Sequence, residues 1–257
     1  MILEFFKYQG TGNDFVIIDD RNNIFPINDN EIVAAICERR MGVGADGLIL
    51  LRNHNKYDFE MIYFNSDGNL SSMCGNGGRC IVAFAAILGI IEHEAEFIAI
   101  DGVHKAKLTK EGVFLQMRDV KSIERRLSGL FLNTGSPHYV QMLETFTSLN
   151  VNKEGRKIRN STDFSKDGVN VNFVLDADPL EVRTYERGVE SETLSCGTGV
   201  VAAVIAMHYS NIIADSIVDV KTRGGILSVD FEEFNGVYRN IWLSGDVSMV
   251  YAGEFEC

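Results

Sequence analysis

The feature that most constrains the fold of this chain is a similarity between its two halves. Thr11-Gly12-Asn13 and Thr134-Gly135-Ser136 each open a segment that runs into apolar sequence and later reaches a Cys-Gly-x-Gly motif. The glycine of each tripeptide precedes the cysteine of its motif, Cys74 or Cys196, by 62 and 61 residues. Because solenoids and propellers repeat every ~20 to 50 residues, this period indicates a tandem pair of domains rather than an array.

The parallel continues beyond each cysteine. An apolar helical stretch follows, Gly78–Leu88 in the first half and Gly199–Met207 in the second. Hairpin-like strands come next, around Gly102 and Gly225, and then two Gly-Val pairs, Gly112-Val113 and Gly236-Val237. Landmarks that keep the same order and nearly the same spacing indicate a duplicated fold.

We therefore predict an α/β (α+β) protein made of two pseudo-symmetric α/β domains, with the active site in the cleft between them. The predicted halves are residues 1–118 and 119–250, and we expect the tail 251–257 to join the first half. Equivalent positions of two such halves can face each other across a cleft. Here those positions are Cys74 and Cys196.

Local patterns agree with a mixed fold. Apolar runs predict strands at Leu3–Tyr8, Phe15–Asp19, Gly47–Leu51 and Tyr57–Phe64. Between them, the pattern of apolar residues predicts an amphipathic helix over Asn28–Arg40. We expect Asn28 to be its N-cap, because Glu31 follows at the spacing of a capping box.

Charge and hydropathy exclude several classes of protein. The net charge of −12 argues against nucleic acid and anionic membranes as partners, because such proteins concentrate positive charge. The longest apolar run, Ile81–Ile91, has 11 residues, whereas a membrane span needs about 18. Glu4 stands where a signal peptide would be basic, and five widely spaced cysteines suit a reducing compartment, so we expect a cytoplasmic protein.

Each Cys-Gly-x-Gly motif is a glycine-rich turn that opens an apolar helix. The first amides of a helix have no partner within it, and the helix dipole places partial positive charge there. A thiol at such a position has its pKa lowered, and the amides can hold a carboxylate. Cys74 and Cys196 are therefore candidate reactive thiols, each beside a carboxylate-binding turn.

Two such thiols suit the inversion of an amino-acid α-carbon. One face of the carbon must lose a proton while the other gains one, so a thiolate and a thiol form a base and an acid that exchange roles. The carbanion is enolate-like, and amides aimed at the carboxylate stabilise the transition state more than the ground state. This chemistry requires neither a metal nor an organic cofactor.

Free cysteine is usually a small buried hydrophobe, and we interpret Cys37, Cys80 and Cys257 in that way. A different class of function remains open, namely a thiol metal-binding or redox-sensing module that uses Cys74, Cys80, Cys196 and His138. Zinc sites usually bring cysteines in short Cys-x2-4-Cys pairs. Five residues separate Cys74 from Cys80, so the spacing fits such a module poorly.

At these residues the chain resembles the diaminopimelate epimerase family, whose cofactor-independent enzymes interconvert LL- and meso-diaminopimelate on the route to lysine and peptidoglycan precursors. The resemblance covers essentially the whole chain. Eight motifs occur in order, namely Gly10-Thr11-Gly12-Asn13-Asp14-Phe15, Gly42-Val43-Gly44-Ala45-Asp46-Gly47, Phe64-Asn65-Ser66-Asp67-Gly68, Met73-Cys74-Gly75-Asn76-Gly77, Asn133-Thr134-Gly135-Ser136-Pro137-His138, Gly168-Val169-Asn170, Glu186-Arg187-Gly188 and Cys196-Gly197-Thr198-Gly199.

The resemblance implies a role for each matched residue and a homodimer. Cys74 and Cys196 would be the acid/base pair, and His138 and Glu186 would influence their protonation. The residues implied to bind substrate are Asn13, Asn65, Gly75, Asn76, Ser136, Asn170, Glu186, Arg187, Gly197 and Thr198. Ser136 stands where the family commonly has Asn, and its hydroxyl, which still donates and accepts hydrogen bonds, is shorter than the amide.

The nearest alternative is another two-cysteine racemase of the same architecture, of the proline, hydroxyproline or histidine type. Relatives that act on cyclic imino acids typically carry His after the first Cys-Gly, where this chain has Asn76. They also have no distal carboxylate for Arg187 to hold. Both residues favour diaminopimelate as the substrate.

Overall fold

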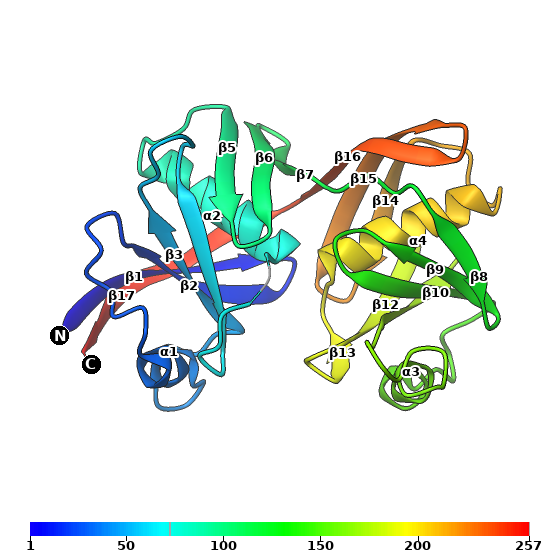
Figure 1. Ribbon diagram of the computed structural model, residues 1–257, viewed down its shortest axis with the longest axis horizontal. Helices are drawn as coiled ribbons and strands as arrows, with labels where there is room; N and C mark the ends of the chain where they lie inside the picture. The colour runs from blue at the N-terminus through cyan, green and yellow to red at the C-terminus, as the bar shows by residue number, and fades with distance from the viewer. Residues whose placement is uncertain (72, 257) are drawn as a thin grey trace. The chain divides into compact units, whose positions relative to one another are not determined.

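The chain folds into two units, which a computed structural model describes over residues 1–71 and 73–256 (Figure 1). Unit 1 comprises Met1–Leu115 and the C-terminal segment from Asp246, and unit 2 comprises Gln116–Gly245. Cys257, expected to be an unreactive thiol, lies outside the described residues.

The elements of unit 1 are a mixed sheet and two helices. In chain order they are β1 (Ile2–Gly10), β2 (Asn13–Asp19), α1 (Asn30–Cys37), β3 (Gly47–Arg52), β4 (Glu60–Asn65), α2 (Gly75–Ile87), β5 (Glu94–Ala99), β6 (Gly102–Thr109), β7 (Gly112–Gln116) and β17 (Val247–Glu256). The last strand, β17, pairs antiparallel with β1 along its length, so both ends of the chain lie in this unit (Figure 1).

Unit 2 has the same kinds of element. They are β8 (Ile123–Arg126), β9 (Gly129–Asn133), β10 (Pro137–Leu143), α3 (Val151–Arg159), β11 (Asn170–Leu175), β12 (Leu180–Glu186), β13 (Ser191–Thr193), α4 (Gly197–Tyr209), β14 (Ile217–Thr222), β15 (Gly225–Phe234) and β16 (Val237–Gly245).

Strand pairing confirms the repeat. In unit 1, β1 to β7 pair in the sequence antiparallel, parallel, antiparallel, parallel, antiparallel, antiparallel. In unit 2, the strands β9, β10, β11, β12, β14, β15 and β16 pair in the same sequence. The glycines expected at equivalent turns, Gly102 and Gly225, both have positive φ, which an L side chain rarely adopts.

Each unit buries one apolar helix among its strands. In unit 2, α4 contacts β9 to β12 and β14 to β16, and Val200–Met207 is buried throughout. In unit 1, α2 contacts β1, β2, β3, β6 and β17. A helix that is apolar on all sides is stable only when it is enclosed in this way. Each Cys-Gly-x-Gly turn therefore opens the central helix of its unit.

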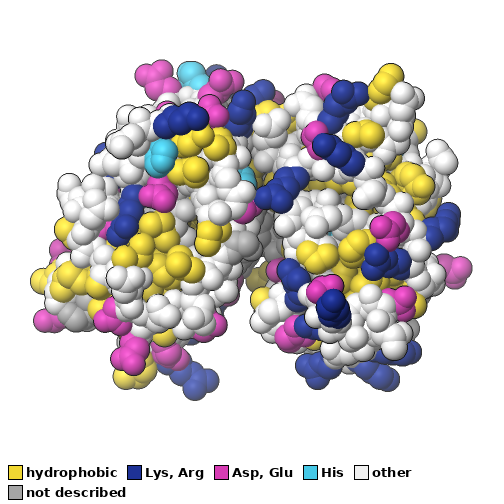
Figure 2. Space-filling view, in the orientation of Figure 1, with side chains coloured by type: hydrophobic (Ala, Val, Ile, Leu, Met, Phe, Trp, Pro, Cys, Tyr) yellow, Lys and Arg dark blue, Asp and Glu magenta, His cyan; other side chains and the backbone are white. Residues whose placement is uncertain are grey.

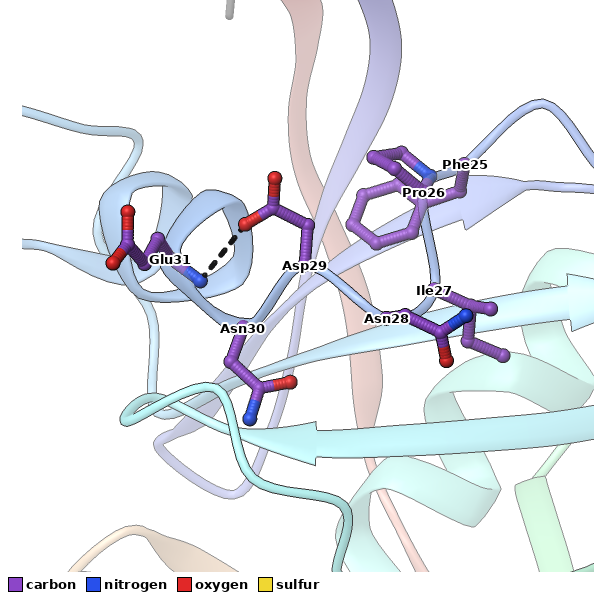
Figure 3. Close-up of a pocket in the computed structure, with 7 residues that line it drawn as sticks. All are labelled: Phe25, Pro26, Ile27, Asn28, Asp29, Asn30 and Glu31. Carbon is purple, nitrogen blue, oxygen red and sulfur yellow. Dashed lines mark hydrogen bonds between the residues drawn. The ribbon is translucent and has the colours of Figure 1, made fainter.

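The N-cap expected for the first helix is wrong by one residue. Helix α1 begins at Asn30, and Oδ1 of Asp29 accepts a hydrogen bond from the backbone N–H of Glu31 at 3.2 Å (Figure 3). It also accepts from the backbone N–H of Ile32 at 3.2 Å. A carboxylate satisfies these amides and also interacts favourably with the helix dipole, so Asp29 caps the helix in place of Asn28. The helix ends at Cys37, because Glu38 is extended.

The surface carries both signs of charge. In Figure 2, basic and acidic side chains are interspersed over the visible face of both units. That face therefore has no continuous basic area among the described residues. Within residues 1–71 and 73–256, no helix is long and apolar enough to cross a membrane.

Candidate active site

The two expected thiols occupy equivalent places in the two units. Cys74 directly precedes α2, Cys196 directly precedes α4, and both have extended backbone dihedral angles. Neither side chain makes a capping hydrogen bond to its own helix. Cys196 is 7% exposed and Cys74 is partly buried.

In unit 1, the expected binding residues gather at one edge of the sheet. Strand β2 begins at Asn13, β3 begins at Gly47, and β4 ends at Asn65. Gly47 lies opposite both Phe15 of β2 and Asn65 of β4. The strand register therefore places Asn13 and Asn65 at the same edge.

Asn13 connects this edge to Cys74. Its Oδ1 lies 3.5 Å from Sγ of Cys74 and accepts a hydrogen bond from Nδ2 of Asn76 at 3.2 Å. Its Nδ2 donates to Oδ2 of Asp46 at 2.6 Å. Since a carboxylate can only accept, Asp46 fixes which end of the Asn13 amide faces the thiol.

A group of charges holds Asp46 in place. Arg39 bridges the carboxylates of Asp46 and Asp14 at 2.7 and 2.8 Å, and Nζ of Lys7 lies 2.7 Å from Asp14. Burial acts to raise the pKa of Asp14, but hydrogen bonds and charge from Arg39 and Lys7 outweigh it and lower that pKa to about 2. Asp14 is therefore an anion that anchors both cations.

Arg79 lies in α2, three residues after Asn76, and is fully buried. One of its nitrogens, Nη2, lies 3.1 Å from Oδ1 of Asn76 and 3.3 Å from Oγ1 of Thr11. Within the described residues, its Nε and Nη1 donate no hydrogen bond. Because a guanidinium can only donate, Arg79 orients the amide of Asn76 toward Asn13.

Unit 2 repeats the arrangement at its own sheet edge. Strand β10 runs parallel to β11 with His138 opposite Asn170, and β12 ends at Glu186. Nδ2 of Asn170 lies 2.9 Å from Oγ of Ser136, and the Oδ1 of Asn170 accepts from the backbone N–H of Arg187 at 2.8 Å. Ser136, Asn170 and Arg187 are thus brought together.

His138 reaches the first turn of α4. Its Nε2 lies 2.9 Å from Oγ1 of Thr198, and that oxygen lies 3.6 Å from Sγ of Cys196. On the other side of the ring, Nδ1 lies 3.0 Å from Nδ2 of Asn172. Burial, together with the positive charge of Arg187, lowers the pKa of His138 to about 3, so the imidazole is neutral near pH 7.

Two other expected residues are placed less tightly. Glu186 is partly buried, and its Oε1 accepts a hydrogen bond from Oγ1 of Thr193. Asn65 is exposed, and among the described contacts its side chain makes no hydrogen bond to the group around Cys74. Gly75 and Gly197 are the first residues of α2 and α4.

Two of the three thiols expected to be unreactive, Cys37 and Cys80, are buried. Cys37 and Cys80 are 3% and 0% exposed, and burial raises the pKa of both thiols to about 12. Among the described residues, no group of three His, Cys, Asp or Glu side chains could hold a metal ion.

Asp46, Arg79 and Asn172 belong to these hydrogen-bond groups although they were not among the expected site residues. Asp46 and Arg79 lie in or beside motifs that were recognised for other residues. Asn172 follows Asn170 by two positions in an otherwise apolar, buried strand. A polar residue in such a strand is itself a signal, because its burial requires hydrogen-bond partners.

Solved structures share the fold at low sequence identity. A PhzF-family protein of Bacillus anthracis superposes with a TM-score of 0.76 at 13% identity, and all of both chains is covered. A hydroxyproline epimerase of Agrobacterium vitis, with bound trans-4-hydroxy-L-proline, has a TM-score of 0.67 at 14% identity over 98% of this chain and 92% of that one. These similarities establish the fold alone.

Sequence relatives are much closer. The sequence profile described as Diaminopimelate epimerase matches residues 5–122 and 130–250. A diaminopimelate epimerase of Flavobacterium psychrophilum is 47% identical, covering 97% of this chain and 98% of that protein. One of Aquifex aeolicus is 41% identical, with 98% and 97% covered. The chain therefore belongs to the diaminopimelate epimerase family.

Proposed function

We propose that this protein interconverts LL- and meso-diaminopimelate, with Cys74 and Cys196 as the acid/base pair. The observation that supports this best is the equivalence of the two thiols, each at the start of the buried central helix of its unit. A thiolate removes the α-proton from one face while a thiol delivers a proton to the other. The roles then exchange for the reverse reaction.

The proposed transition state has enolate character, so negative charge spreads onto the carboxylate at the reacting carbon. We assign Gly75-Asn76 and Gly197-Thr198 to that carboxylate, because they form the first turns of α2 and α4. The backbone N–H groups and the dipole of a helix N-terminus stabilise an anion. This stabilisation grows as charge develops, which lowers the barrier.

The far end of the substrate carries a second ammonium and a second carboxylate. We assign substrate binding, mostly at this end, to Asn13, Asn65, Ser136, Asn170, Glu186 and Arg187. The guanidinium of Arg187 can hold a carboxylate through two hydrogen bonds, and Glu186 can accept from the ammonium. His138 and Glu186 are proposed to influence the protonation of the thiols.

We also propose that the site lies between residues 1–118 and 119–250 and that the protein is a cytoplasmic homodimer. We further propose that it binds neither nucleic acid nor membranes, which the net charge of −12 supports. The chemistry proposed here needs no cofactor.

The test is to incubate the purified protein separately with LL-diaminopimelate, L-proline, trans-4-hydroxy-L-proline and L-histidine, and to resolve the stereoisomers by chiral chromatography. We expect meso-diaminopimelate to form and the other three amino acids to remain unchanged. Inversion of one of those three without conversion of diaminopimelate would replace the proposed substrate while keeping the two-thiol chemistry.

A further inference from the structure

Asn172 lies at the centre of a buried group of hydrogen bonds in unit 2. Its Nδ2 lies 3.0 Å from Nδ1 of His138 and 3.2 Å from the backbone oxygen of Tyr139. Its Oδ1 accepts from Oγ1 of Thr184 at 3.0 Å. Asn172 and His138 are both fully buried, so these bonds do not compete with solvent.

The direction of each bond follows from the chemistry of its ends. The backbone oxygen of Tyr139 can only accept, so the amide end of Asn172 that faces it must be the NH2 group. The same NH2 group faces Nδ1 of His138, and therefore Nδ1 must accept and carries no proton. A neutral imidazole then carries its single proton on Nε2, which donates to Oγ1 of Thr198 at 2.9 Å.

This direction determines what remains for the thiol. Oγ1 of Thr198 accepts from His138, so the proton of that hydroxyl is left to donate to another group. Sγ of Cys196 lies 3.6 Å away, within hydrogen-bond distance for sulfur. A hydroxyl donor stabilises a thiolate more than a thiol, because hydrogen bonds to a charged acceptor are stronger.

The first turn of α4 is built to admit Asn172. A Cβ added to Gly199 would lie 2.3 Å from Oδ1 of Asn172, closer than any real contact allows. The second glycine of the Cys-Gly-x-Gly motif therefore leaves room for this amide. Glu186 ends β12 and Arg187 follows it. Burial, together with the positive charge of Arg187, lowers the pKa of His138 and keeps its imidazole neutral.

We propose that Asn172 is a positioning residue that holds His138 in the Nε2–H tautomer, so that Thr198 donates to Cys196 and stabilises its thiolate in the substrate-free protein. The relevance of this thiolate to turnover rests on the proposed function. The tautomer and the thiolate do not, because both are measured without substrate.

The first experiment reads the tautomer by NMR of the protein labelled with 15N-histidine. The His138 signals are assigned as those missing from a His138→Gln variant. We expect a protonated Nε2 and an unprotonated Nδ1 in the wild-type protein near pH 7. A protonated Nδ1 would overturn the proposal, and this result depends on no variant of Asn172.

The second experiment replaces the side-chain NH2 group of Asn172 by an oxygen atom. In Asn172→Asp the carboxylate can only accept, so it favours a proton on Nδ1, and Nε2 then accepts from Thr198. Cys196 loses its donor. We expect its alkylation by iodoacetamide near pH 7, mapped by peptide mass spectrometry, to slow about tenfold, the effect of losing one hydrogen bond to a charged group.

The added carboxylate also acts electrostatically on Cys196. Variants of Thr198 distinguish this effect from the change in hydrogen bonding. In Thr198→Val the hydroxyl is absent, so Asn172→Asp should slow alkylation of Cys196 little further, whereas in Thr198→Ser the full effect should return. An equal effect of Asn172→Asp in both backgrounds would show a purely electrostatic influence and would overturn the relay. Failure of the proposed function would instead appear as wild-type protein that does not convert diaminopimelate.

Discussion

His138 and Thr198 are joined by a 2.9 Å contact between Nε2 and Oγ1, although 60 residues separate them in the chain. The contact ties the sheet edge of unit 2 to the first turn of α4, two residues after Cys196. A buried, neutral imidazole is thereby held one hydroxyl away from a candidate acid/base thiol. Its protonation has consequences for stability that can be measured.

We expect His138 to make the protein less stable in mild acid. Its pKa is about 3 when folded, below the usual ~6.5 of unfolded chains, so the unfolded state binds the extra proton first. Stability is therefore fully present above pH 6.5 and decreases as pH falls toward 3, by about 1.4 kcal/mol per pH unit. Urea unfolding of the wild type and of His138→Asn between pH 6.5 and 4 measures this, and equal slopes would contradict it.

Asp46→Asn should impair turnover without unfolding the protein. The amide that replaces the carboxylate can donate to Asn13, so the side chain of Asn13 is no longer held with its oxygen toward Cys74. We expect kcat to fall about tenfold, typical of the loss of one charge-assisted hydrogen bond. Asp230→Asn, on an exposed position of β15, is the matched control. Similar kcat values for the two variants would refute the positioning role of Asp46.

Arg79→Met should separate activity from stability. Replacing a buried charge by an apolar side chain of similar size is often neutral or stabilising, and two nitrogens of Arg79 have no hydrogen-bond partner within the described residues. Asn76 nevertheless loses the donor that orients it. We expect an unchanged or higher urea midpoint together with a kcat at least about tenfold lower. A lower midpoint with unchanged kcat would show that Arg79 is only structural.

Arg187→Ala should mainly weaken binding of the far end of the substrate. Nη1 of Arg187 is held by the backbone oxygen of Asp167 at 2.8 Å, which leaves the rest of the guanidinium for a carboxylate. We expect kcat/KM for diaminopimelate to fall about 100-fold, as for a lost bidentate ion pair. Steady-state kinetics beside Arg125→Ala, an exposed arginine of β8, provides the comparison. Equal small effects would remove Arg187 from the distal site.

The repeat and the placement of both thiols could be predicted because they depend on local signals. Glycine turns, apolar helix runs and their spacing are visible in the sequence, and Gly102 and Gly225 indeed occupy equivalent positive-φ turns. Helix α3 was not predicted. It is polar, and it contains Gly155, where a Cβ would lie 2.4 Å from Cβ of Tyr185. Only the tertiary contact explains a glycine inside that helix.

The hydrogen-bond groups around the thiols could be predicted only in part. The sequence identifies Asn13 and His138, but their orientation depends on Asp46 and Asn172, which strand register brings to them from elsewhere in the chain. Similarly, Asp29 and not Asn28 is the N-cap of α1. Both residue types are good N-caps, so the sequence does not distinguish them, and the backbone position at which the helix begins determines which one is used. Motifs thus predict which residues gather, whereas side-chain direction requires the structure.

The most direct test of the account is deuterium exchange at the α-carbon, measured by NMR for the wild type, Cys74→Ala and Cys196→Ala with LL-diaminopimelate in D2O and no added cofactor. The account predicts deuterium at the α-carbon together with meso product in the wild type, and loss of meso product in both variants. Meso product formed at the wild-type rate by either variant would contradict a mechanism that requires both thiols.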